Sequence, residues 1–465
     1  MHLGKGARLH FLGIGGSGML PLAQAALEFG FAVSGTDLSL GPRLDDLRAS
    51  GAQVVEEAFG ADLLCTATHV ICSSAIARSH VLLQLALQQG KALLHRSDLL
   101  NFFCQQKKTI AVAGTHGKSS TAAMVTYALH QTGRFPSYIL GAPLQGGLGA
   151  AAWDTRGEWL VIEADESDRT HEKYHPELAL VTSVDFDHLD CYGSGQEIVR
   201  SFVQFLSQAT RSAVVHPQGE LGQCVPQEWK MLTRHKPSLK TYGTAEGLMN
   251  RVGSLSFQNG GGSGTYQLEG GATQNVELPQ LGQHSFLNAL GAGLVCQEAG
   301  LSWSQYLQCM RTFPGVYRRL QVAAYQQTWV WVDDYAHNPG KIQAAVQAVR
   351  QAWPSSRLSV IFEPHRYSRL QTMAEAFFQA FRPANDVYVT EVYAAGEQDE
   401  EGVWTAAAIA SQIGQYSGVS SQAFSAAVVI DQVRAVDQHC VLLTLGAGGV
   451  RELGARLIEQ LSCQE

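Results

Sequence analysis

The stretch that decides the fold is AVAGTHGKSSTAAMV, residues 111–125. Apolar residues lead into a glycine-containing turn, which is followed by Lys118, two serines and a segment that favours a helix. This order is typical of phosphate-binding loops, because the N–H groups at the start of a helix attract anions. The usual P-loop motif has a glycine five residues before the Gly-Lys pair, but here that position is Val112. Taken alone, the turn also fits a purely structural role.

Acidic residues follow two later apolar runs, in VIEADESD (161–168) and VTSVDFDHLDCYG (181–193). The carboxyl ends of parallel strands form the ligand-binding edge of an α/β sheet, and carboxylate oxygens suit Mg²⁺. Some of these side chains can equally cap helices or lie in solvated turns. Together with the Gly-Lys-Ser turn, the segments favour a nucleotide site with magnesium. The residues concerned are Glu163, Asp165, Glu166 and Asp168 in the first segment, and Asp185, Asp187, His188 and Asp190 in the second.

The composition predicts a globular protein of several domains. The chain has 465 residues, of which 45% are hydrophobic and 16% charged, and its length exceeds that of one ordinary core. A net charge of −8 argues against a dedicated nucleic-acid binder. Nine cysteines without a C-x-x-C pair predict reduced thiols, and no signal peptide or membrane span is expected. The protein is therefore expected in the cytoplasm, away from membranes.

Strand-like and helix-like segments alternate along the whole chain, which predicts parallel sheets covered by helices. The expected α/β domains are residues 1–106, 107–312 and 313–465. Residues 252–280 differ, because short strand-like runs there are separated by NGGGSG. We expect this stretch to form β-hairpins attached to the middle domain.

A second glycine-rich turn, GIGGSGM (13–19), follows the first expected strand. Such a turn can hold any diphosphate, so the motif fits either NAD or a UDP sugar. In the NAD reading, Asp37 would bind the ribose. The following ATPase-like segment, and the lack of an evident hydride site, favour the UDP sugar.

Eight motifs, in this order, resemble the Mur ligase family over nearly the whole chain, and most closely its L-alanine-adding branch. They are GIGGSGM, SSAI, GTHGKSS, EADESD, DHLD, DDYAH, PHRYSR and YAAGE. The ATP loop of that family is the shorter G-x-x-G-K-[ST], so Val112 is expected. The resemblance implies a Rossmann-like N-terminal domain for a UDP sugar, a central P-loop-type ATPase domain, and a Rossmann-like C-terminal domain for an amino acid.

The reaction implied by the resemblance joins L-alanine to UDP-N-acetylmuramate, with ATP and Mg²⁺, during peptidoglycan precursor synthesis. ATP converts the lactyl carboxylate to an acyl phosphate, and the amino group of alanine then attacks it. Such chemistry depends on positioning, charge neutralisation and exclusion of water. The protein is expected to act as a monomer or a weak homodimer, without nucleic acid.

The resemblance also assigns residues to each ligand. ATP is assigned Gly114, Thr115, His116, Gly117, Lys118, Ser119, Ser120 and Asn288, with Arg319 and Asp333 from the third domain; Mg²⁺ is assigned Ser119, Glu163 and His188. The UDP sugar is assigned Gly15, Gly16, Ser17, Gly18, Met19, Asp37, Ser73 and Ser74. The amino acid is assigned Tyr335, His337, His365, Arg366 and Arg369, and the residues implied in catalysis are Lys118, His188, His337, Arg366 and Arg369. Arg366 and Arg369 are expected on one side of a helical turn, where a guanidinium fork suits the carboxylate of alanine.

The chain departs from the family pattern at Ser285, where an asparagine is usual, and at Asn338, where a histidine is often found. It has no lysine between Lys173 and Lys230, so it lacks the lysine that several Mur ligases carbamylate after the DH motif. The alanine-adding branch lacks that lysine as well.

Three alternatives remain open from the sequence. A recycling ligase would attach a tripeptide to the same UDP sugar and would need a roomier third domain. An NAD-dependent oxidoreductase with a fused ATPase domain, and a nucleotide-binding module without catalysis, belong to other functional classes.

Overall fold

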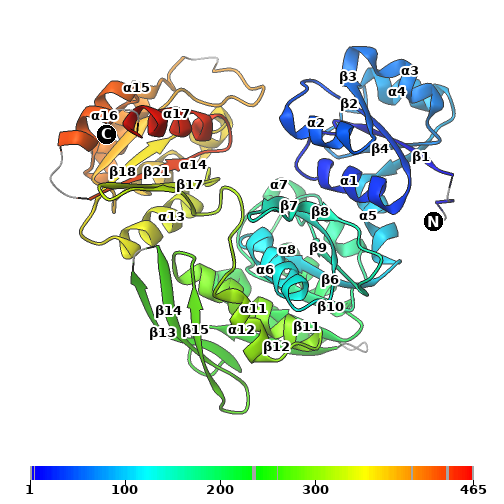
Figure 1. The fold of residues 1–465 in the computed structure, drawn as a ribbon, viewed down its shortest axis with the longest axis horizontal. Helices are drawn as coiled ribbons and strands as arrows, with labels where there is room; N and C mark the ends of the chain where they lie inside the picture. Colours follow the sequence, from blue (N-terminus) through cyan, green and yellow to red (C-terminus); the bar gives the residue numbers. More distant parts are fainter. Residues whose placement is uncertain are drawn as a thin grey trace. The chain divides into compact units, whose positions relative to one another are not determined.

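The computed structural model describes residues 3–4, 6–232, 237–258, 260–399, 402–435 and 439–462. The chain forms two compact units. The N-terminal unit comprises Met1–Gly253, Thr265–Gln274 and Leu287–Val316, and the C-terminal unit comprises Ser254–Gly264, Asn275–Phe286 and Tyr317–Glu465. Their strands belong to three sheets (Figure 1). No helix among the described residues is long and apolar enough to cross a membrane.

The first sheet has five parallel strands in the order β3-β2-β1-β4-β5. Strand β1 is central, so the glycine-rich turn that follows it lies at the middle of the sheet's carboxyl edge. The strands are β1 Arg8–Leu12, β2 Ala32–Asp37, β3 Gln53–Glu56, β4 His69–Cys72 and β5 Ala92–His95. The helices are α1 Leu20–Phe29, α2 Pro42–Ala49, the 3-10 turn η1 Glu57–Phe59, α3 Gly60–Thr66, α4 Val81–Gln88 and α5 Arg96–Cys104.

The second sheet has ten strands in the order β15-β14-β13-β12-β11-β10-β6-β9-β7-β8. Strand β6 lies between β10 and β9, and its residues Ile110–Ala113 are fully buried. The strands are β6 Lys108–Ala113, β7 Ser137–Leu144, β8 Gly149–Ala152, β9 Trp159–Glu163, β10 Leu178–Val181, β11 Ser212–Val215, β12 Ser238–Gly243, β13 Asn250–Gln258, β14 Gly261–Gln267 and β15 Thr273–Leu278. The helices are α6 Lys118–Gln131, the 3-10 turn η2 Thr170–Lys173, α7 Leu189–Tyr192, α8 Gly195–Ser207, α9 Gly219–Gly222, α10 Val225–Met231, α11 Gln283–Glu298 and α12 Trp303–Met310.

The strands predicted within residues 252–280 are present, because β13, β14 and β15 extend the second sheet at one end. Their attachment to the middle domain alone stays a prediction, because Ser254–Gly264 and Asn275–Phe286 belong to the C-terminal unit. The strand–turn–helix prediction around residues 111–125 is confirmed too, since β6 ends at Ala113 and α6 begins at Lys118.

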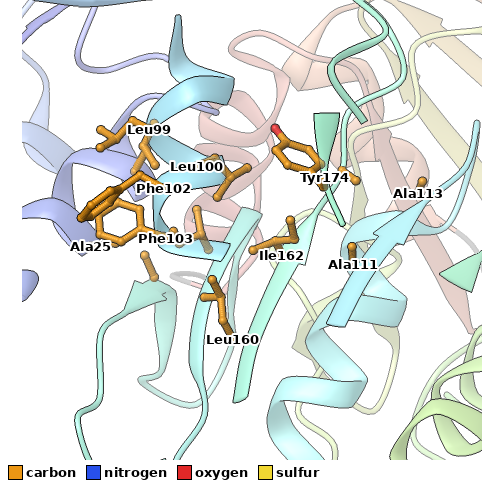
Figure 2. Close-up of a cluster of buried hydrophobic side chains, with 14 of the residues drawn as sticks. Ala25, Leu99, Leu100, Phe102, Phe103, Ala111, Ala113, Leu160, Ile162 and Tyr174 are labelled. Atoms are coloured by element: carbon orange, nitrogen blue, oxygen red, sulfur yellow. The ribbon is translucent and has the colours of Figure 1, made fainter. Parts of the chain in front are cut away.

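The first two sheets share one hydrophobic cluster within the N-terminal unit. Figure 2 shows Phe102 and Phe103 of α5 in this cluster, together with Leu160 and Ile162 of β9. Phe103 also stacks at a tilt on Trp153, with ring centroids 5.2 Å apart. This shared apolar surface is removed from water when both sheets are in place, so it stabilises the two domains as one unit.

The third sheet has six strands in the order β16-β17-β21-β18-β19-β20, and its strands pair in parallel apart from β16. The central strands β17, β21 and β18 bring the loops that follow them to one edge. The strands are β16 Gln321–Tyr325, β17 Trp329–Asp334, β18 Arg357–Phe362, β19 Asp386–Val389, β20 Ser420–Ala423 and β21 Cys440–Leu445. The helices are α13 Pro339–Ala352, α14 Tyr367–Gln379, α15 Ala406–Ser417, α16 Ala426–Ala435 and α17 Val450–Ser462. The predicted three-domain α/β fold class is confirmed.

Candidate active site

The turn between β6 and α6 requires glycine at two positions. Gly114 has φ +132° and Gly117 has φ +84°, both in the region that disfavours other residues. A Cβ atom at Gly114 would lie 2.3 Å from Oγ1 of Thr182, and one at Gly117 would lie 2.5 Å from Oδ1 of Asn288. The turn is therefore packed tightly on both sides, and Asn288, predicted to contact ATP, lies directly against it.

The segment that follows β10 holds this turn in place. The backbone N–H of His116 donates to Oγ of Ser183 at 2.8 Å, and the N–H of Asp185 donates to Oγ1 of Thr115 at 3.0 Å. No side chain caps the N-terminus of α6, a helix of 14 residues. Its first N–H groups, which belong to predicted ATP-binding residues including Ser120, are thus positioned to attract an anion.

Lys118 directs its ammonium group at the same turn. Its Nζ donates to the carbonyl oxygen of Gly114 and to Oε1 of Glu166, each at 2.6 Å. Burial lowers the pKa of Lys118, but the nearby carboxylates of Glu166, Asp165 and Glu163 more than offset this and raise it. Lys118 therefore carries a fixed positive charge beside the helix start.

Glu166 is itself deeply buried, with 6% of its side chain exposed. Burial raises the pKa of this carboxyl group. Its second oxygen, Oε2, is buried without a hydrogen-bond partner. The sequence placed Glu166 among the acidic candidates, and the structure gives it a specific role, which is to orient Lys118.

Two of the predicted magnesium ligands meet beside the turn. Ser119 donates from Oγ to Oε2 of Glu163 at 3.0 Å, and the N–H of Gly141 donates to Oε1 of Glu163 at 2.6 Å. Glu163 ends β9, next to β6. A hydroxyl and a carboxylate are hard oxygen donors, so this pair fits Mg²⁺, which also takes waters and phosphate oxygens as ligands.

His188, the third predicted magnesium ligand, lies immediately before α7 with φ +54°. Its Nε2 is 3.8 Å from Oδ2 of Asp187. Among the described residues, no group of three or more His, Cys, Asp or Glu side chains is placed to hold a metal ion. The assignment of His188 to magnesium therefore stays a prediction.

The glycine-rich turn after β1 is supported by Asp37, which ends β2. The N–H of Gly15 donates to Oδ2 of Asp37 at 2.8 Å, so this carboxylate holds the turn. Of the other residues predicted to bind the UDP sugar, Met19 is buried, Gly16, Ser17 and Gly18 are exposed, Ser73 is half-buried and Ser74 is exposed.

Arg96 links this turn to the acidic segment of the middle domain. Its Nη2 donates to Oδ2 of Asp165 at 2.6 Å and to Oδ2 of Asp168 at 3.1 Å. Its Nη1 is 3.5 Å from the position that a Cβ of Gly18 would occupy. Ser74, predicted at the UDP sugar, donates to the same Asp168 oxygen at 3.0 Å. Sequence reasoning missed Arg96, although a basic residue directly after an apolar strand was a usable signal.

In the C-terminal unit, the structure brings together most of the residues predicted to bind the amino acid. The ring centroids of His337 and Tyr335 are 5.1 Å apart, and those of His337 and His365 are 5.2 Å apart. Arg369 donates from Nη1 to Nδ1 of His365 at 2.7 Å. These side chains follow β17 and β18, at the carboxyl edge of the third sheet, where ligands commonly bind.

Arg366 differs from its prediction. It is the residue before α14 and has φ +65° and ψ 133°, so it lies outside the helix, and the expected helical alignment with Arg369 is wrong. Its N–H donates to the carbonyl oxygen of Tyr393 at 3.0 Å, which holds the backbone in this conformation while the residue stays exposed.

Three protein-family models match the chain in the order of its three sheets. The model described as "Mur ligase family, catalytic domain" matches residues 8–108, and "Mur ligase middle domain" matches residues 112–296. The model described as "Mur ligase, glutamate ligase domain" matches residues 318–448. A protein from Geobacter sulfurreducens named UDP-N-acetylmuramate--L-alanine ligase is 32% identical over 98% of this chain and 98% of its own length. The protein of the same name from Syntrophomonas wolfei is 33% identical over 98% of this chain and 97% of its own.

The chain belongs to the Mur ligase family.

Solved structures share the fold of this Mur ligase. The UDP-N-acetylmuramate-alanine ligase from Thermotoga maritima has a TM-score of 0.82 at 24% identity, covering 98% of this chain and 100% of that one. A murein peptide ligase from Psychrobacter arcticus has a TM-score of 0.69 at 22% identity, covering 98% and 99%.

Two other predicted ATP contacts of this Mur ligase lie in its C-terminal unit. The guanidinium of Arg319 lies over the ring of Tyr335, 5.6 Å from its centroid. Asp333 is fully buried, and its carboxylate accepts from Arg451 at 2.7 Å and from Thr444 at 2.6 Å. Strand β17 is enclosed by β16 and β21, and the assignment of Asp333 to ATP stays a prediction.

The two departures from the family pattern have local structural uses. Oδ1 of Asn338 accepts from the N–H of Lys341 at 2.9 Å and so caps α13. The hydroxyl of Ser285 donates to the carbonyl oxygen of Leu281 at 2.7 Å.

Proposed function

We propose that this Mur ligase uses ATP to join L-alanine to the lactyl carboxylate of UDP-N-acetylmuramate, in peptidoglycan precursor synthesis. The observation that carries the proposal is the full-length similarity to relatives named UDP-N-acetylmuramate--L-alanine ligase. The tightly packed turn around Lys118 supports the ATP-dependent part of it.

In the first step, an oxygen of the lactyl carboxylate attacks the γ-phosphorus of ATP, and ADP leaves. Lys118 and the first N–H groups of α6 would neutralise charge on the transferring phosphoryl group. Ser119 and Glu163, with His188, would hold Mg²⁺, which when bound neutralises phosphate charge. Asn288, beside Gly117, would contact the nucleotide.

In the second step, the amino group of alanine attacks the acyl carbon, and phosphate leaves as the amide forms. The group formed by Tyr335, His337, His365 and Arg369 would bind and orient the amino acid. Arg366, which is exposed beside this group, would supply a further positive charge for its carboxylate or for the intermediate.

The experiment that tests this function measures ADP release from ATP. We expect release to require both UDP-N-acetylmuramate and an amino acid, with L-alanine preferred and glycine and serine as the nearest competitors. One methyl group contributes about 1–3 kcal/mol of discrimination, so these competitors should retain activity. Preference for the L-Ala-D-Glu-diamino acid tripeptide over alanine would identify a recycling ligase instead.

Binding measurements with NAD, ATP and the UDP sugar distinguish the ligase from the two other functional classes. Tight NAD binding without binding of the UDP sugar would favour an oxidoreductase, and nucleotide binding without substrate-dependent ADP release would favour a module without catalysis. Location in the cytoplasm and action as a monomer or weak homodimer belong to the same proposal. None of the eight cysteines in the described part of the chain is placed in a disulfide, which is consistent with the cytoplasmic location.

Replacement of Gly18 tests the UDP-sugar turn. A Cβ there would already touch Arg96, so the larger side chain of Gly18→Leu would fill the space beside the turn. We expect the KM for UDP-N-acetylmuramate to rise by about tenfold or more, with the KM for ATP changed by less than about twofold. Gly6→Leu is the matched control, because a Cβ at this exposed residue meets nothing within 4 Å. Equal changes in both KM values would count against the assignment.

A further inference from the structure

The two histidines at the carboxyl edge of the third sheet make hydrogen bonds that define which ring nitrogen carries the proton. Nδ1 of His337 lies 2.8 Å from the backbone carbonyl oxygen of Tyr335. A carbonyl oxygen can only accept, so Nδ1 of His337 must be the donor. In the neutral ring, Nε2 of His337 then carries a lone pair and acts as an acceptor.

His365 is held in the opposite way. Nη1 of Arg369 lies 2.7 Å from Nδ1 of His365, and a guanidinium can only donate. Nδ1 of His365 is therefore the acceptor, and its Nε2 carries the proton. The ring of His365 also stacks on Tyr393, with centroids 5.6 Å apart and an interplanar angle of 18°, which fixes its orientation.

Both rings are neutral at physiological pH. Burial, with smaller contributions from the nearby cations, lowers the pKa of His337 to about 3 and that of His365 to about 4. Within the described part of the chain, neither Nε2 atom has a hydrogen-bond partner. The site thus presents one ring acceptor and one ring donor, on histidines whose centroids are 5.2 Å apart.

We propose that Arg369 is a positioning residue that keeps the two histidines as opposite tautomers, so that Nε2 of His337 accepts from the amino group of the substrate amino acid and Nε2–H of His365 donates to its carboxylate. This inference rests on the proposed function for the identity of the ligand. It changes the role predicted for Arg369, because its Nη1 serves His365 and also lies 3.5 Å from the carbonyl oxygen of His337.

Opposite tautomers explain how the site distinguishes the two ends of an amino acid. Two ring acceptors would both favour the amino group, and two ring donors would both favour the carboxylate. A neutral His337 also avoids the repulsion that a protonated ring would exert on an incoming ammonium group.

The test is ¹⁵N NMR of the full-length enzyme labelled at histidine, with the two signals assigned from His337→Gln and His365→Gln spectra. We expect the wild-type spectrum to show the Nδ1–H tautomer for His337 and the Nε2–H tautomer for His365. The same tautomer at both histidines would overturn the proposal. This result comes from the wild-type spectrum and needs no variant of Arg369.

The Arg369→Met variant, which keeps length but loses the donor, should release His365 into a mixture of tautomers while His337 stays unchanged. Its KM for alanine should rise by about tenfold or more, with the KM for ATP within about twofold of wild type. Arg456→Met is the matched control, because Arg456 is exposed on α17, and it should change neither tautomer.

Retention of the wild-type His365 tautomer in Arg369→Met would overturn the positioning role. The tautomer test and the test of the proposed function can fail independently. If the enzyme shows the expected tautomers but does not release ADP with alanine, the substrate assignment is wrong. The two tautomers would then serve another ligand that has one donor and one acceptor group.

Discussion

We expect the Lys118→Ala enzyme to fold but to turn over at least about a hundredfold more slowly than wild type, on the order of 3 kcal/mol of transition-state stabilisation. The ammonium of Lys118 is held by Gly114 and Glu166 at the start of α6, where a phosphoryl group would carry its negative charge. No other lysine or arginine in the described part of the chain forms an ion pair with Glu166. Steady-state ADP release at saturating substrates measures the loss.

The Lys118→Ala substitution leaves the buried Glu166 without its ion-pair partner, so folding is measured alongside turnover. The double variant Lys118→Ala, Glu166→Gln removes that charge and should recover stability without recovering turnover. Lys108→Ala removes an exposed lysine at the other end of β6, paired with Glu158, and should behave as wild type. Near-normal turnover in folded Lys118→Ala would contradict the phosphate-site assignment.

Much of this site could be predicted because its signals are local. Gly114, Gly117 and Lys118 lie within five residues, and apolar strand and helix patterns on either side fix the direction of the turn. The pairing of Ser119 with Glu163 follows from parallel strands ending at one edge, which is a general property of α/β sheets.

Contacts between distant segments could not be predicted in the same way. Arg96 lies 69 and 72 residues from its two carboxylate partners, Asp165 and Asp168, and only the packing of α5 on the middle domain brings them together. Its local sequence does not indicate which carboxylates it will meet.

In the C-terminal unit, the position of a residue at the end of a strand is also insufficient to predict its contacts and backbone conformation. Asp333 lies near the carboxyl end of β17, as ligand-binding residues often do, but the strand is buried along its whole length, and the carboxylate of Asp333 accepts hydrogen bonds from Thr444 and Arg451, which the local sequence does not indicate. The conformation of Arg366 could not be predicted for another reason, since a positive φ is uncommon in an arginine and its N–H donates to Tyr393, which lies 27 residues further along the chain.

The Gly114→Ala substitution should produce the second large effect, by displacing the phosphate turn. At φ +132°, alanine is strained, and its Cβ would lie 2.3 Å from Oγ1 of Thr182 and 2.9 Å from the backbone N of Ser183. Backbone strain and overpacking are each expected to lower the free energy of unfolding by about 1–3 kcal/mol. The segment after β10 also holds the turn, because the Oγ of Ser183 accepts from the N–H of His116 and the N–H of Asp185 donates to Thr115, so relief of the clash would move the turn itself.

We therefore expect Gly114→Ala to lower the melting temperature and to weaken ATP binding by at least about tenfold, measured by thermal unfolding and by calorimetric titration. The matched control is Gly133→Ala, at the other end of α6, where φ is +72° but a Cβ meets nothing within 4 Å. The control carries backbone strain without the clash, so it should lose some stability and retain ATP affinity. If both variants bound ATP equally well, the contact with Thr182 would not be what positions the turn, and the phosphate would have to be held mainly by side chains such as Lys118.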